Sequence, residues 1–129
     1  MFVKTLILSV FLVISLSAPA ADENQPKQGP RTRWDGYLID VACARERKAT
    51  ETDLGKKHTR KCMEMPACER SGFGLLTEDN QFLPFDEKGN RKVRALLEHT
   101  NQNDRLRAIV YGTKFNDMLQ ARKIELRKR

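Results

Sequence analysis

The first regular pattern along the chain is an alternation of apolar and polar positions over residues 32–41. A period of two is typical of a β-strand, because successive side chains point to opposite faces. One face carries Tyr37, Ile39 and Val41, and the other carries Trp34, Gly36, Leu38 and Asp40. Because both faces hold apolar side chains, we predict a strand that is partly covered on both sides.

Two short apolar runs, residues 73–77 and 81–85, flank the polar turn Glu78-Asp79-Asn80. This arrangement predicts a β-hairpin. Pro84 has no backbone N–H to donate, so its strand should lie at a sheet edge or end early.

A helix is predicted after the turn residues 86–90, with Asn90 as its N-cap. Its apolar face is formed by Val93, Leu96, Leu97 and Thr100. His99, near its end, is expected to face solvent.

The C-terminal part predicts two more strands, separated by a turn at residues 113–117. The first alternates through Leu106, Ala108 and Val110. In the last strand, Leu119 and Ala121 share one parity and Ile124 and Leu126 the other. This change predicts a β-bulge near Arg122-Lys123 that keeps all four on one face.

The order of these elements is strand, insertion, strand, strand, helix, strand, strand. It predicts a mainly β fold with one helix, an OB-like five-stranded barrel over residues 32–129. The insertion after the first strand covers residues 42–71, carries all three cysteines and is expected to form short helical turns. The alternative is a small open α+β sheet with the helix on one face.

The N-terminus resembles a secretory signal peptide rather than part of the fold. Residues 1–20 contain Lys4, an apolar run over residues 6–16, and the small residues Ala18 and Ala20. Residues 21–31 then read as a flexible leader. We therefore expect an exported protein, periplasmic or secreted, without a transmembrane segment after signal cleavage.

The insertion offers a metal-ligand set of three cysteines and one histidine: Cys43, His58, Cys62 and Cys68. Three thiolates and an imidazole can complete a tetrahedral zinc site. In a helix His58 and Cys62 would share a face, and Pro66 would end that helix and return Cys68 toward them. The separation of Cys62 from Cys68 is wider than in a zinc finger, and export exposes thiols to oxidation.

The preferred interpretation of the three cysteines is one disulfide and a spare thiol. Cys43 paired with Cys62 or Cys68 closes a larger loop than a Cys62–Cys68 bridge does, and so constrains the unfolded chain more. The third cysteine stays unmatched.

Two further roles concern neighbouring residues. Met63 and Met65 add soft thioether donors, which would suit copper rather than zinc. Asp40 either orients a ligand or caps the next helical turn.

Composition and motifs predict a non-catalytic binding or structural domain. No Cys-x-x-Cys, Gly-x-Ser-x-Gly, Gly-rich phosphate loop or His-Glu-x-x-His motif is present. The net charge of +7 suits an anionic envelope surface or an acidic protein partner, although solubility alone also accounts for it. Export argues against a nucleic-acid ligand.

The chain resembles small exported bacterial proteins of uncharacterised function with an OB-like fold. The matching residues are Gly36-Tyr37-Leu38-Ile39-Asp40-Val41-Ala42-Cys43, then His58, Cys62 and Cys68, then residues 71–76 and Val110-Tyr111-Gly112. The resemblance implies that the three cysteines and the histidine form a shared constellation. It implies no activity, metal or substrate.

The disulfide interpretation predicts the oxidation state of the exported protein. After denaturation, intact mass should show two cysteines oxidised and one alkylated. Alkylation of all three thiols would contradict it.

Overall fold

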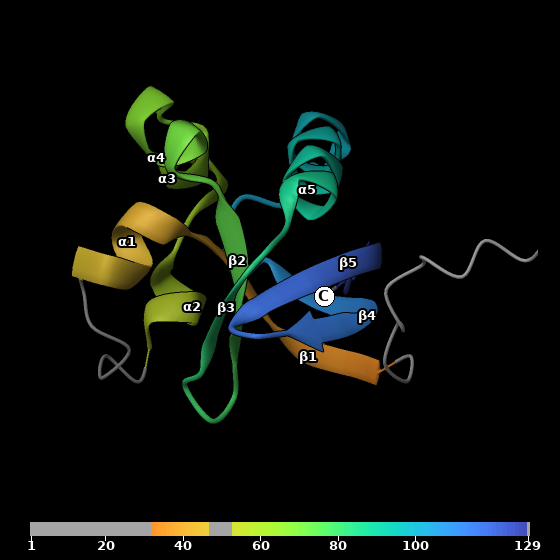
Figure 1. Ribbon diagram of the computed structural model, residues 1–129. Coiled ribbons are helices and arrows are strands. Elements are labelled where there is room, and N and C mark those ends of the chain that lie inside the picture. Colours follow the sequence, from red (N-terminus) through yellow and green to blue (C-terminus); the bar gives the residue numbers. More distant parts are fainter. Residues whose placement is uncertain (1–31, 47–52, 129) are drawn as a thin grey trace, which may run out of the picture.

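A single antiparallel sheet organises the part of the chain that the computed structural model describes, residues 32–46 and 53–128 (Figure 1). Its strands are β1 (Thr32–Asp40), β2 (Phe73–Thr77), β3 (Phe82–Pro84), β4 (Arg107–Phe115) and β5 (Met118–Leu126). They lie in the order β3-β2-β1-β4-β5. The helices are α1 (Val41–Glu46), α2 (Leu54–Lys57), α3 (Arg60–Met63), α4 (Pro66–Ser71) and α5 (Glu87–His99). Figure 1 shows α1 to α4 on one side of β2 and α5 on the other.

The mainly β class, the five strands and the helix between the third and fourth strands are confirmed. The closed barrel is not: the described sheet stays open, and its edge strands β3 and β5 form no ladder, although an isolated bridge joins Phe85, just after β3, to Leu119. β3 is too short to form a closing ladder, and Pro84 lies on this edge strand as its missing N–H predicts. The open-sheet alternative describes this feature better. The expectation of one helix in the whole fold is wrong, whereas the short helical turns expected in the insertion are confirmed as four short helices among its described residues.

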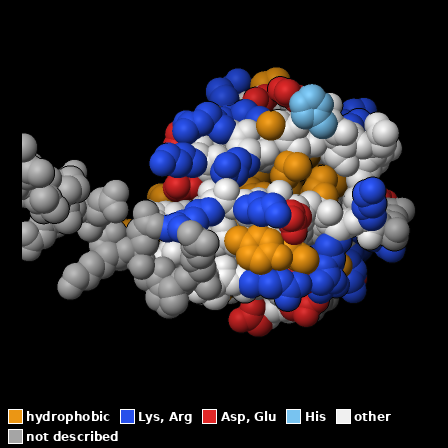
Figure 2. All heavy atoms as spheres, turned by 90° about the vertical axis from the view of Figure 1, so that its right-hand side faces the viewer, with side chains coloured by type: hydrophobic (Ala, Val, Ile, Leu, Met, Phe, Trp, Pro, Cys, Tyr) orange, Lys and Arg blue, Asp and Glu red, His pale blue; other side chains and the backbone are white. Residues whose placement is uncertain are grey.

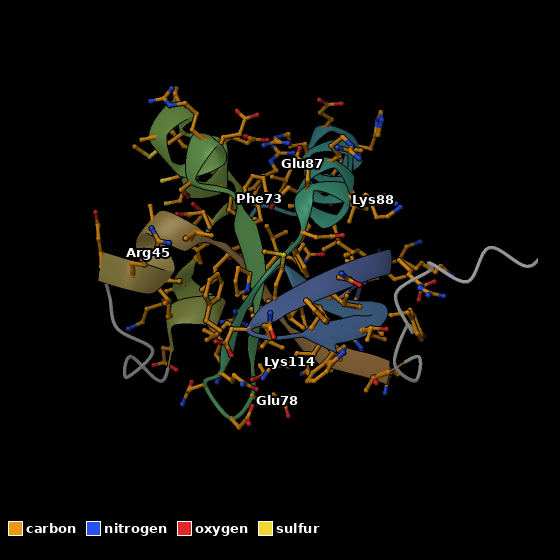
Figure 3. The ribbon with its side chains drawn as sticks, viewed as in Figure 1. Arg45, Phe73, Glu78, Glu87, Lys88 and Lys114 are labelled. Atoms are coloured by element: carbon orange, nitrogen blue, oxygen red, sulfur yellow. The ribbon has the colours of Figure 1, made fainter. Side chains whose placement is uncertain are left out.

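The first strand is covered on both faces, as its sequence pattern predicts. Leu38 belongs to the main hydrophobic core, whereas Ile39 packs with Leu54 and Leu76 in a smaller cluster on the other side. Figure 3 places Phe73, a fully buried member of the main core, where β2 begins beside α5.

The bulge in the last strand is confirmed. Tyr111 pairs with Lys123, and the next residue, Gly112, pairs with Ala121, so Arg122 is the additional residue. The bulge allows Leu119, Ala121 and Ile124 all to be buried in the main core.

The helix α5 begins earlier than predicted, because Asp86 rather than Asn90 is its N-cap. The Asp86 side chain accepts a hydrogen bond from the backbone N–H of Gly89 (2.9 Å). Asn90 lies inside the helix, and its side chain accepts a hydrogen bond from Phe73 N–H (2.8 Å). The apolar face is confirmed, since Val93 and Leu97 are buried and His99 is exposed.

The insertion departs from the predicted helix through His58 and Cys62. His58 is the extended C-cap of α2, and Thr59 caps α3 by accepting a hydrogen bond from Cys62 N–H (3.2 Å). Pro66 begins α4 instead of ending a helix, as suits a residue without a donor at the first helical position.

The proposed signal peptide and leader, residues 1–31, lie outside the described residues. Among the helices described, none is long and apolar enough to span a membrane.

Figure 2 shows one face of the molecule, where Lys and Arg side chains surround a patch of hydrophobic side chains.

Replacement of Asp86 by alanine should destabilise the fold by about 1 kcal/mol, because the first turn of α5 loses its cap. Asp86 also accepts a weak hydrogen bond from Ala121 N–H in β5 (3.4 Å). Urea denaturation of Asp86→Ala against Lys88→Ala, an exposed position in the same turn, provides the comparison. Equal stabilities would contradict the capping role.

Candidate metal centre

The candidate site begins with a buried carboxylate at the end of the central strand β1. Asp40 has 0% of its surface exposed. One carboxylate oxygen, Oδ1, accepts a hydrogen bond from Cys43 N–H at 2.8 Å and so caps the first turn of α1. The capping role considered from the sequence is therefore confirmed.

His58 faces the other oxygen of this carboxylate. Its Nε2 lies 2.8 Å from Asp40 Oδ2, and its side chain is 4% exposed. Two contacts fix its position: His58 N–H donates to Leu54 O in α2 (2.9 Å), and Leu54 is anchored in the smaller core cluster. The turn of α2 also packs closely on β1, where a Cβ on Gly55 would lie 2.6 Å from Tyr37.

Cys43 completes a compact group with these two residues. One ligand atom from each of Asp40, Cys43 and His58 lies within 4.8 Å of the others. Burial raises the pKa of the Cys43 thiol to about 12, and the charge of Asp40 and a hydrogen bond to its carboxylate add to the effect. The thiol therefore stays protonated at neutral pH, which disfavours nucleophilic thiol chemistry.

Cys68 reaches the same carboxylate from α4. Burial, followed by the charge of Asp40 and a hydrogen bond to it, raises the Cys68 pKa, while a hydrogen bond with Cys43 lowers it. α4 is held against α1 by Ser71, whose hydroxyl accepts from Ala42 N–H (3.1 Å) and donates to Cys68 O (2.6 Å). Gly72 then takes a positive φ of 85°, which turns the chain from α4 into β2.

Cys62 lies at the margin of this cluster. Its charge raises the pKa values of Cys43 and Cys68, and no hydrogen bond between Cys62 and either thiol is among the causes of these shifts. The structure thus brings Cys43, His58 and Cys68 around Asp40 and leaves Cys62 farther out.

The cysteines and methionines of the insertion bear on the disulfide and copper interpretations. All three cysteines are free thiols, so the disulfide stays a prediction. Met63 is fully buried in the main hydrophobic core, and Met65 is 52% exposed, so neither supports the copper interpretation. Asp40 was omitted from the predicted ligand set, although its parity with Leu38 indicated a buried position.

No family model matches the chain, and neither a curated protein nor a solved structure matches it significantly. The chemistry of the site therefore rests on its own residues.

The raised pKa of Cys43 predicts slow alkylation in the folded protein. The thiolate is the reactive form, so a rise from 9.0 to about 12 lowers its population at pH 8, and the rate should increase with pH up to about 12. We expect alkylation at least about a hundredfold slower than in the urea-unfolded chain. The measurement uses metal-free protein with Cys62→Ser and Cys68→Ser, which leaves Cys43 as its single thiol.

Asp40→Asn in the same background should accelerate the reaction, because it removes the negative charge that opposes the thiolate. Asp53→Asn, an exposed position, is the control. Equal rates in the folded and unfolded chains would show that Cys43 is not protected in this way.

Proposed function

We propose that this chain is a zinc-binding protein that holds the ion between Asp40, Cys43, His58 and Cys68. The observation that carries the proposal is the convergence of Asp40, Cys43 and His58, whose ligand atoms lie within 4.8 Å of one another. Cys68, whose thiol hydrogen-bonds to the same carboxylate, would be the fourth ligand.

The spacing and chemistry of these groups suit a tetrahedral ion. Ligand atoms bound at about 2.0–2.3 Å from one zinc ion lie roughly 3.3–3.8 Å apart, so small side-chain movements close the set. Two partly buried thiols beside a buried carboxylate are hard to deprotonate. A divalent cation offsets the charge of the thiolates and releases their protons to solvent.

The mixed donor set favours zinc over copper. Zinc accepts oxygen, nitrogen and sulfur ligands together, whereas Cu(I) prefers thiolates and thioethers. The thioether of Met63 is packed in the core, away from this role.

In this proposal the zinc ion has a structural role in an exported, non-catalytic domain of OB-like architecture. The strand order, with β1 between β2 and β4, and the bridge from Phe85 to Leu119 support the OB-like relation. The anionic envelope surface or acidic partner proposed from the charge stays part of this hypothesis.

One observation favours a second candidate, a domain whose insertion is ordered by a disulfide. The thiols of Cys43 and Cys68 contact each other through a hydrogen bond. Their oxidation would join α1 to α4 directly and leave Cys62 as the spare thiol.

Metal content separates the two candidates. Protein purified without chelator should contain about one zinc ion per chain, and Cys43→Ser or Cys68→Ser should lose most of it, because each removes a thiolate ligand. Cys62→Ser is the matched control and should retain zinc. Element analysis and intact mass measure metal and disulfide in the same samples.

Three other outcomes are informative. Folded protein without zinc but with a disulfide would reject the zinc site and support the second candidate. Loss of zinc from Cys62→Ser would instead favour the set of three cysteines and His58. Folded protein with neither zinc nor a disulfide would contradict both.

A further inference from the structure

A second charged centre surrounds Asp35, near the middle of β1. Three guanidinium groups contact this one carboxylate: Arg107 at 2.8 Å, Arg127 at 3.2 Å and Arg33 at 3.7 Å. Arg107 also pairs with Glu78, which Figure 3 places at the β2–β3 turn. One aspartate cannot neutralise three arginines, so positive charge remains in excess here.

A hollow of about 300 Å³ lies against this centre. Its lining consists of Tyr37, Gln102, Arg105, Arg107, Arg127 and Lys128. Four of these six side chains are cations. The carboxylates of Asp35 and Glu78 offset two of these four positive charges. The two that remain match the charge of a dianion.

The hollow is also extended by a neighbouring polar depression. Gln102 and Lys128 line both, and the depression is otherwise formed by residues 99–101, 103 and 104. A ligand with one anionic end can therefore place the rest of its structure over the loop between α5 and β4.

Arg105 occupies a backbone conformation that does not suit its side chain. Its φ is +48°, in the left-handed region that favours glycine and asparagine. The Gln102 side chain donates to Arg105 O (2.8 Å), and Arg107 N–H donates to the same oxygen (2.7 Å). Such strain persists where surrounding contacts hold it, and it is concentrated at functional sites.

We propose that this hollow is an anion site for a phosphate-bearing ligand, with Arg105, Arg107, Arg127 and Lys128 as its cationic groups. Guanidinium groups match phosphate oxygens through paired hydrogen bonds. Arg107 and Arg127 are pre-oriented by Asp35, while Arg105 and Lys128 are exposed at the opening. This site is independent of the proposed zinc site.

The test is calorimetric titration of the full chain with inorganic pyrophosphate, together with three single variants. Wild type should bind with saturation below about 10 mM, and Arg105→Gly should weaken binding about tenfold, as expected for one lost charge-assisted contact. The same variant should raise Tm, because glycine relieves the strained φ. Arg70→Ala, which removes one exposed positive charge in α4, should bind within about twofold of wild type.

A gain in Tm with lost binding distinguishes a ligand-binding Arg105 from a structural one. Lys128→Ala, at the opening, should also weaken binding. Unchanged pyrophosphate affinity in Arg105→Gly, equal weakening in Arg70→Ala, or equally tight binding of citrate would each overturn the proposal.

A second experiment determines whether the phosphate belongs to a lipid headgroup or to a soluble ligand. Vesicles of phosphatidylglycerol in phosphatidylcholine are compared with pyrophosphate, using pure phosphatidylcholine as the blank. Binding to the anionic vesicles that is lost in Arg105→Gly supports the site with a lipid headgroup as ligand. Binding of pyrophosphate alone supports it with a soluble phosphate. Binding of neither in wild type overturns the site.

Discussion

The described structure depends on how the buried carboxylate of Asp40 is compensated. A carboxylate without exposed surface costs several kcal/mol unless donors or charges replace its water. Here the compensating groups come from separate helices: the backbone N–H of Cys43 in α1, the imidazole of His58 after α2, and the thiol of Cys68 in α4. Helices of four to six residues are unstable in isolation. Contacts with the shared Asp40 carboxylate therefore help to hold the helices of the insertion together.

Most of the fold was predictable because it follows from local apolar patterns. The double-sided burial of β1 and the displaced face of β5 both follow from parity, since a strand places alternate side chains on opposite faces. Closure of the sheet does not follow from such patterns. It depends on hydrogen bonds between edge strands far apart in sequence, and β3 is too short to supply them. The N-cap of α5 was misplaced because Asp86 and Asn90 are both good capping residues, and contacts with β5 and with Phe73 assign their different roles.

The candidate site was less accessible to sequence reasoning. Its cysteines and histidine were found by residue type, but their relative positions depend on where the chain leaves α2. The extended conformation of His58 separates it from the helix of Cys62 and turns it toward Asp40. Asp40 shares the parity of the buried Leu38, and this parity is the strongest local sign of the site in the sequence. Tertiary contacts determine which residues pack around the end of β1, and such contacts leave no comparable pattern in the sequence.

The central strand β1 joins two electrostatically opposite environments. Arginine side chains contact Asp35 on a partly exposed surface, whereas thiols and an imidazole lie against the buried carboxylate of Asp40. Five residues of strand separate their α-carbons by about 17 Å. A cation bound at Asp40 and an anion bound near Asp35 would therefore not collide. β1 is hydrogen-bonded on both sides, to β2 and to β4, and has little freedom to shift along its length. Asp35 and Asp40 are therefore held at a fixed separation along the strand.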